Sequence, residues 1–259
     1  MSSNWPTEIE AKLVVISTDR EAVFSELREV SSFAGLAARP FSERFLTDRY
    51  FDLPNAQLAS HGCALRLRRQ AEGEVVRTIM TFKGALRSET GLGTERAEIE
   101  AEWSAEIMLE IIAELREMGI HVVDASLTAN QTPRDALAEL GFSLIQQRQT
   151  KRLATDLDRG AGPVAELALD HVTYGSGPVR IDHYELEVEA LGGTDATEVN
   201  RIATELLHGR PGDLRPWKLS KTAVGRALEE LQAEDGLGEV LTGNQLSSAG
   251  YDLLERRLA

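Results

Sequence analysis

The sequence has one cysteine, no long apolar run and no recognisable leader, and each absence narrows the class of protein. The single cysteine, Cys63, excludes an internal disulfide and any metal site built from several cysteines. Because no run of about 18 apolar residues occurs, we expect no membrane-spanning helix. The first residues, MSSNWPTEIE, lack the basic region and apolar stretch of a signal peptide. We therefore expect a cytoplasmic protein with no membrane partner.

An excess of positive charge is also missing. The chain carries 42 acidic and 28 basic residues, a formal net charge of -14. Proteins that bind nucleic acid broadly need a basic surface, so this balance argues against a nucleic-acid partner. It is compatible with a small anionic ligand, because a locally basic cavity can focus the field inside an acidic body.

Alternation of charged and apolar residues is the main structural signal. In TEIEAKLVV, Glu8, Glu10 and Lys12 alternate with apolar residues, and a period of two predicts a β-strand with two different faces. The same reasoning predicts eight strands, at 8–16, 43–53, 63–70, 75–84, 94–103, 143–157, 163–174 and 179–191. Helices are expected at 17–33, 104–119, 195–209 and 220–232, with a short one near 250–257. The fold class predicted is α+β and strand-rich, a closed eight-stranded antiparallel barrel with helices packed outside.

The charged faces of the strands suggest what such a barrel would enclose. On a single strand a charged face is ordinarily the solvated side of the sheet. Here seven strands repeat the pattern, so with helices outside the charges would converge inside the barrel. Buried charges cost several kcal/mol each unless they are paired, so they must pair or await a charged ligand. Carboxylates suit Mg²⁺ or Mn²⁺, and Arg and Lys suit phosphate, a combination used in phosphoryl transfer.

An ordered set of motifs carries a resemblance to a known family. These motifs are ExExK (8–12), RYFD (49–52), ALRLRR (64–69), TFKG (81–84), RAEIE (96–100), TKR (150–152), ELALD (166–170), YELEVE (184–189) and LSKTAVGRAL (219–228). In content and order they resemble the CYTH superfamily, the triphosphate tunnel metalloenzymes, over about residues 5–232. The resemblance implies a tunnel domain at 1–232, a tail at 233–259, and a site that binds a triphosphate with Mg²⁺ or Mn²⁺.

The resemblance also implies roles for individual residues. The implied metal ligands are Glu8, Glu10 and Glu189. The implied catalytic acidic residues are Glu8, Glu10, Glu100, Asp170, Glu187 and Glu189. The implied phosphate-binding residues are Lys12, Arg66, Arg68, Lys83, Arg96, Arg152, Lys218 and Lys221. Arg148 is left out of this set, because the spacing around QRQTKR departs from the commoner forms of the family.

Other residues are expected to be structural. The histidines show no ligand spacing and are expected at the surface or at strand edges: His61, His121, His171, His183 and His208. Trp217 is expected to anchor the helix that follows it by packing.

The function implied by the resemblance is metal-dependent hydrolysis of a triphosphate, with inorganic tripolyphosphate as substrate and orthophosphate as product. Two other enzymes are alternatives, a class IV adenylate cyclase acting on ATP and a thiamine triphosphatase. A non-catalytic module that binds polyphosphate or nucleotide is a further alternative. With 5% aromatic residues, the sequence shows no aromatic cluster that marks a pocket for a base. The family also makes a homodimer a reasonable expectation.

Overall fold

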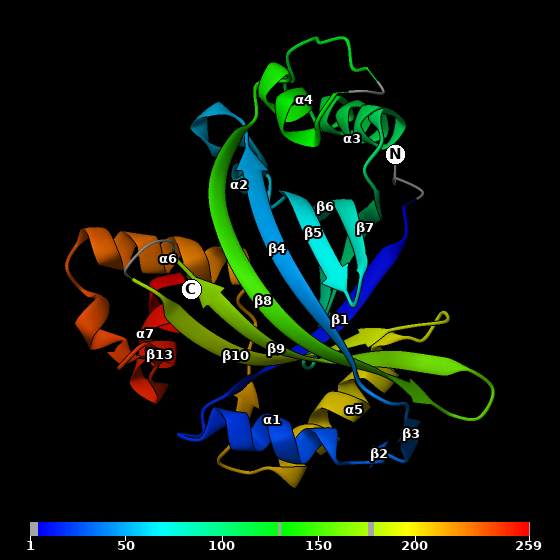
Figure 1. Cartoon of the computed structure of the whole chain (residues 1–259), viewed down its shortest axis with the longest axis vertical. Coiled ribbons are helices and arrows are strands. Elements are labelled where there is room, and N and C mark those ends of the chain that lie inside the picture. Colours follow the sequence, from blue (N-terminus) through cyan, green and yellow to red (C-terminus); the bar gives the residue numbers. More distant parts are fainter. Residues whose placement is uncertain (1–4, 129–130, 176–178, 259) are drawn as a thin grey trace.

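The structure, a computed structural model, describes residues 5–128, 131–175 and 179–258, and its centre is a closed barrel (Figure 1). Eight antiparallel strands follow one another round the ring in the order β1, β7, β6, β5, β4, β8, β9 and β10, and β10 pairs back onto β1. They are β1 (Thr7–Val15), β4 (Ser42–Asp52), β5 (Ala64–Glu72), β6 (Val75–Thr90), β7 (Gly93–Glu102), β8 (Ser143–Asp158), β9 (Pro163–Tyr174) and β10 (Ile181–Ala190). The predicted closed antiparallel barrel is confirmed.

The register of β1 shows how the alternating sequence is used. Glu10 pairs with Glu189 of β10 on one side and with Thr94 of β7 on the other. Its neighbours Ala11 and Leu13 lie in an apolar cluster on the outside of the barrel. Because successive side chains alternate between faces, a slip of one residue would bring the charges outward, so the apolar face fixes the register.

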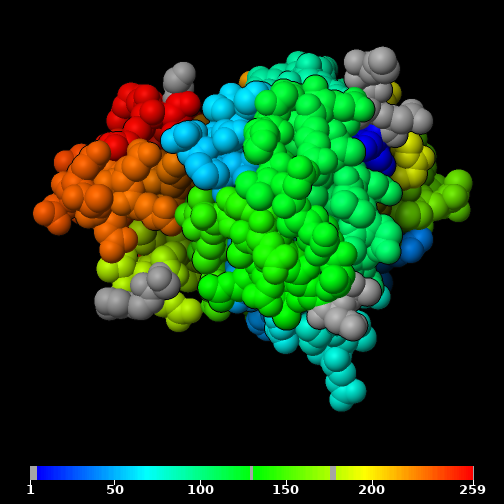
Figure 2. Space-filling model, turned by 90° about the horizontal axis from the view of Figure 1, so that it is seen from above, coloured from blue at the N-terminus to red at the C-terminus, as the bar shows by residue number. Residues whose placement is uncertain are grey.

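Helices cover the outer face of the barrel, as predicted. One apolar cluster joins β1, β9 and β10 to α1 (Arg20–Arg28) and α5 (Ala196–Gly209). A second joins β5, β6 and β7 to α3 (Ala105–Glu117) and α4 (Pro133–Glu139). Seen from above in Figure 2, the chain from α3 through α4 spreads over this face. The apolar faces of the strands are thereby buried outside, which leaves the charged faces to line the interior.

Several short elements were not anticipated. They are β2 (Ser32–Phe33), β3 (Leu36–Ala38), the 3₁₀ turns η1 (Pro54–Ala56) and η2 (Leu237–Glu239), α2 (Gln57–Ser60), β11 (Leu214–Pro216), β12 (Leu241–Thr242) and β13 (Gln245–Leu246), besides α4. The helix predicted at 17–33 is too long, since α1 ends at Arg28 and β2 begins at Ser32. There Ala34 and Gly35 take positive φ angles, and the β2–β3 hairpin they turn pairs with β8 instead.

The carboxy-terminal segment, defined here as residues 234–258, packs beside α6 (Lys221–Ala233) and ends in α7 (Ser248–Leu258) (Figures 1 and 2). The short helix predicted near 250–257 is therefore present. The carboxy-terminal segment and α6 belong to one apolar cluster, which also contains Trp217. The cluster includes residues at one end of the barrel interior, among them Val14 and Tyr174. Val14 has the same parity on β1 as Glu10, so it points inward and this end of the barrel is filled. Trp217 is buried there, as expected.

In the part of the chain that is described, no helix is long and apolar enough to cross a membrane. The division into a tunnel domain at 1–232 and a tail at 233–259 stays a prediction.

Candidate active site

A cavity of about 910 Å³ occupies the rest of the barrel interior. All eight barrel strands and the amino-terminal end of α6 contribute to its wall. Most of the residues predicted for the site line it: Glu8, Glu10, Lys12, Arg66, Arg68, Lys83, Arg96, Glu100, Arg152, Glu187, Glu189 and Lys221. The structure therefore brings together residues as far apart in the sequence as Glu8 and Lys221.

Two predicted site residues are placed differently from the rest. Asp170 is fully buried beneath the side chains that line the cavity. There it accepts two hydrogen bonds from Arg152, at 2.7 and 2.6 Å. Lys218 lies away from the cavity, with its side chain 55% exposed and 2.7 Å from Glu89. Lys218 lies just before the motif LSKTAVGRAL and outside α6, whereas Lys221, the first residue of α6, reaches the interior.

The carboxylates of β1 lie among basic side chains. Glu8 Oε1 is 2.5 Å from Lys83 Nζ, and Glu8 Oε2 is 3.6 Å from Arg96 Nε. Glu8 Oε2 is buried and accepts no hydrogen bond. Glu10 lies 3.3 Å from Lys12 Nζ and 3.9 Å from Arg96. One carboxylate oxygen at this end of the cavity thus has unused capacity to accept a cation or a proton.

The protonation of these carboxylates differs with their surroundings. Burial raises the pKa of Glu8 to about 8, and the positive charge of Lys83 offsets only part of that rise. Burial likewise raises the pKa of Glu189 to about 7. Burial would also raise the pKa of Glu10, but Lys12 and Lys83 outweigh it and hold that pKa below its ordinary value. Glu8 and Glu189 therefore bear a desolvation cost that a bound cation would relieve.

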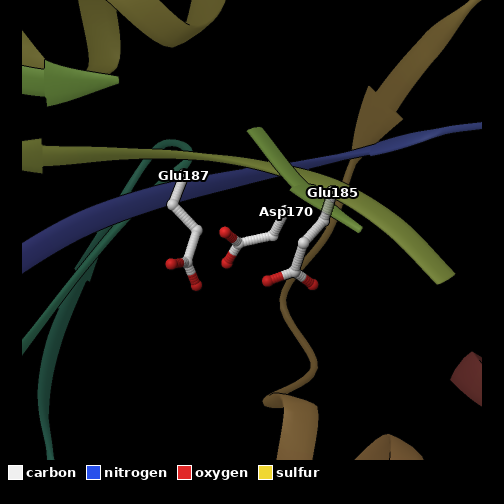
Figure 3. A group of neighbouring side chains, drawn as sticks. All are labelled: Asp170, Glu185 and Glu187. Carbon is white, nitrogen blue, oxygen red and sulfur yellow. The ribbon is translucent and has the colours of Figure 1, made fainter. Parts of the chain in front are cut away.

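A second acidic group lies deeper in the wall. Carboxylate oxygens of Asp170, Glu185 and Glu187 all lie within 4.8 Å of one another, close enough to hold a metal ion, and Figure 3 shows the three side chains converging. Lys221 Nζ lies among them, 3.0 Å from Asp170 and 2.7 Å from Glu187, and also contacts Glu185. Arg152 adds a second positive charge, 2.5 Å from Glu187. In this arrangement lysine and arginine supply the positive charge that the three carboxylates require.

These contacts shift the pKa values as expected for buried ion pairs. Burial alone would raise the pKa of Glu187, but Lys221 and Arg152 overcome it and hold that pKa well below the ordinary value. Burial alone would lower the pKa of Lys221, but Glu185 and Glu187 hold it well above the usual range. Lys221 is thus a fixed positive charge at the wall of the cavity.

Three arginines around a buried aspartate form the opposite, basic part of the site. Asp48 accepts two hydrogen bonds from Arg68, at 2.7 and 2.9 Å, and lies 3.9 Å from Arg66 and 3.8 Å from Arg148. Arg148 also donates to the Tyr50 hydroxyl and stacks over its ring. Arg66 also donates to Glu100 at 2.7 Å, so three positive charges face two carboxylates, and the remaining positive charge suits an anion.

Sequence reasoning missed three of these residues. Asp48 and Tyr50 lie on the charged face of β4, and Tyr50 belongs to the RYFD motif without having been given a role. Arg148 was left out because of the motif spacing, although it shares the parity of Arg152 on β8, and this parity is the signal that would have included it.

His183 corrects the expectation that every histidine lies at the surface or at an edge. Its side chain is fully buried in the barrel interior, with Nε2 2.7 Å from Glu185. It shares the inward parity of Glu185 and Glu187 on β10, and this alternation of polar residues is the sequence signal that could have placed it inside.

Comparison with known proteins agrees with this fold. The CYTH domain model matches residues 6–213, so the chain belongs to the CYTH family. Among curated proteins none matches the chain. The putative adenylyl cyclase HpAC1 from Hippeastrum, described as having a dominant triphosphatase activity, is 23% identical, with a TM-score of 0.56 over 85% of this chain and 95% of that chain. The PH1819 protein from Pyrococcus horikoshii is 19% identical, with a TM-score of 0.52 over 85% and 99%. At these identities the likeness shows the fold.

The residues present fit the metal dependence of the family. Glu8 has a buried carboxylate oxygen without a hydrogen-bond donor, and the pKa values of Glu8 and Glu189 are raised by burial. Carboxylate oxygens are the ligands that Mg²⁺ and Mn²⁺ prefer. Glu8, Glu10 and Glu189, on two adjacent strands, thus form a donor set of suitable chemistry.

Proposed function

We propose that the protein is a divalent-metal-dependent hydrolase of inorganic tripolyphosphate that releases orthophosphate. The observation that carries the proposal is the cavity itself, in which a buried oxygen of Glu8 without a hydrogen-bond donor lies among arginines and lysines. A linear polyanion bound with a cation satisfies both groups at once. In a barrel with a purely structural role, so many buried charges would be destabilising, since each is costly without a partner.

The chain's own residues perform the binding and the charge neutralisation. Glu8, Glu10 and Glu189 would hold Mg²⁺ or Mn²⁺, which when bound withdraws electron density from phosphate oxygens and favours attack by water. Arg66, Arg68, Arg148, Arg152, Lys83 and Lys221 would contact the phosphates. Because they are held in place by ion pairs before substrate arrives, they can stabilise negative charge at the transition state without reorganising. Water attack at a terminal phosphorus then breaks the bond from that phosphorus to the bridging oxygen, so that the products are orthophosphate and, as the leaving group, pyrophosphate.

An organic triphosphate is the second candidate, and one feature of the cavity favours it. Apolar side chains near η1 and α2, including Phe51, Leu53 and Ile145, line part of the wall. A nucleobase or a thiazole ring could contact them, so ATP, as substrate of a class IV adenylate cyclase, and thiamine triphosphate are alternatives. The predicted cytoplasmic location and homodimer stay predictions.

One assay separates the candidates. Purified protein is offered tripolyphosphate, ATP and thiamine triphosphate with Mg²⁺ or Mn²⁺, and orthophosphate, pyrophosphate and cyclic AMP are measured. Phosphate release from tripolyphosphate well above that from the organic substrates supports the proposal. Cyclic AMP with pyrophosphate replaces it by the cyclase, and tight binding of tripolyphosphate without turnover replaces it by a binding module.

The matched pair Glu10→Gln and Glu102→Gln tests the metal-site assignment. Glu10→Gln should abolish metal-dependent turnover and leave the fold intact, because it removes one carboxylate from the donor set. The side chain of Glu102 is 72% exposed on the same barrel and lies 3.6 Å from Arg77, so Glu102→Gln should behave as wild type. Unchanged activity in Glu10→Gln would remove its assigned role.

A further inference from the structure

A chain of buried polar contacts connects the carboxy-terminal segment to the cavity. The Tyr251 hydroxyl of α7 lies 3.0 Å from His183 Nδ1, and His183 Nε2 lies 2.7 Å from Glu185. Glu185 contacts Lys221 Nζ, which reaches Glu187 at 2.7 Å on the cavity wall. Tyr251, His183 and Glu185 are each fully buried, so water does not compete for these contacts.

The chemistry of the groups fixes the direction of the hydrogen bonds. An ionised carboxylate can only accept, so Nε2 of His183 carries a proton and donates it to Glu185. In the neutral imidazole Nδ1 is then an acceptor, and the Tyr251 hydroxyl donates to it. By donating to Nδ1, the Tyr251 hydroxyl stabilises the tautomer whose Nε2–H donates to Glu185. The hydrogen bond from His183 in turn orients the Glu185 carboxylate, which contacts the Lys221 ammonium.

Independent contacts hold Tyr251 in position. Arg20 of α1 donates to the Leu246 carbonyl, and its guanidinium lies 5.8 Å from the Tyr251 ring centre. Arg215 of β11 binds Asp252 at 2.5 Å. The Tyr251 ring also packs edge-on against Trp217, with ring centres 5.2 Å apart. A segment whose only task was to cover an apolar surface would not need a hydroxyl aimed at a buried imidazole.

We propose that Tyr251 is a positioning residue for the cavity, acting through His183 and Glu185 to hold the Lys221 ammonium where it meets a phosphate. The carboxy-terminal segment is then a working part of the site, although it lies outside the residues that the family model matches, 6–213. The inference rests on the proposed function, since it assumes that Lys221 binds the phosphates of the substrate.

The test compares Tyr251→Phe with Tyr184→Phe in the full chain. Tyr184 is also a buried tyrosine, but its hydroxyl donates to Glu21 on the outer face of the barrel, 2.8 Å away. Tyr251→Phe should lower kcat/KM for tripolyphosphate about 3- to 10-fold, the range expected for one buried hydrogen bond. Most of the loss should be in kcat, because the other cations still bind the polyanion while a displaced ammonium stabilises the transition state less well. Tyr184→Phe should match wild type.

The decisive readout is the same substitution in a Lys221→Met background. If Tyr251 acts through Lys221, Tyr251→Phe has no further effect there, whereas a general loss of folded protein would cost the same factor in both backgrounds. Equal losses in the two backgrounds, or no loss in wild type, overturn the inference. Where Lys221→Met does not fold, Lys221→Gln, which removes the positive charge but keeps a polar side chain, takes its place with the same criterion.

A stability cycle keeps the test independent of the reaction. The unfolding equilibrium constants of wild type, both single variants and the double variant are measured in urea without substrate. Coupling should make the double variant differ from the product of the single effects by more than about 2-fold, since contacting networks are non-additive. If the wild-type protein has no triphosphatase activity, the proposed function is refuted, but the stability cycle still tests whether Tyr251 and Lys221 are coupled. Additive effects would refute the connection even in an active enzyme.

Discussion

Glu8 provides the sharpest test of the electrostatic description of the site, because its carboxylate is buried and incompletely paired. Its side chain is 5% exposed, and burial raises its pKa from 4.5 to about 8. In the unfolded chain the same group titrates near its ordinary value. Between these two pKa values the folded protein binds more protons than the unfolded chain. The free energy of unfolding must therefore fall as the pH rises through this window, and level off above it.

The size of the effect follows from the shift. At about 1.36 kcal/mol per pH unit, moving this pKa from 4.5 to about 8 corresponds to roughly 5 kcal/mol. We expect about half of this, roughly 2–3 kcal/mol, because an ionised Glu8 can turn both oxygens toward Lys83 and Arg96. Glu189, with a pKa raised to about 7, adds a smaller decline over the lower part of the same range.

Urea denaturation in chelator, at about pH 5, 6, 7, 8 and 9, measures this decline. Glu8→Gln should make the fall in unfolding free energy between about pH 5 and pH 8 shallower by roughly 2–3 kcal/mol. Glu102→Gln, which changes an exposed carboxylate, should leave the wild-type curve unchanged. Mn²⁺ in place of chelator should restabilise wild type at the alkaline end, by mass action on the folded state. A wild-type curve that is flat or rises from pH 5 to pH 8 in chelator would refute the reasoning.

Two further predictions concern the packing of the charged interior. Asp48→Asn should lower the free energy of unfolding by about 3–5 kcal/mol, measured in urea, because it leaves Arg68 and Arg148 without their buried counter-charge. Added tripolyphosphate should recover part of the loss. A urea midpoint equal to that of wild type would contradict the assigned ion pairs. Gly225→Ala should lower stability by about 1–3 kcal/mol, because its Cβ would meet Gln146 Nε2 at 2.4 Å. Gln146 itself hydrogen-bonds Thr222 and Arg148, so the control is Gln146→Ala alone: in that background Gly225→Ala should cost little, and an unchanged cost would show that the contact is not the cause.

The sequence by itself determined the strands and the face on which each charge lies. Alternation in ExExK and YELEVE depends only on the pleat of an extended chain, so it assigns Glu8, Glu10 and Glu189 to charged faces before any partner strand is known. Apolar residues at the opposite parity then require helices on the other side. Closure into a tunnel followed from repetition of this pattern, together with the resemblance in motif order.

Tertiary structure decided which charges meet and where the interior ends. Lys218 and Lys221 are three positions apart, yet one lies at the surface and the other among Asp170 and Glu187, because the start of α6 fixes their directions. His183 was misplaced as a surface residue, since only the docking of α7 closes its end of the barrel. Pairing between distant strands and packing of a distant helix depend on contacts far apart in the sequence. Local periodicity can assign a side chain to a face, but it cannot name the side chain that it will meet there.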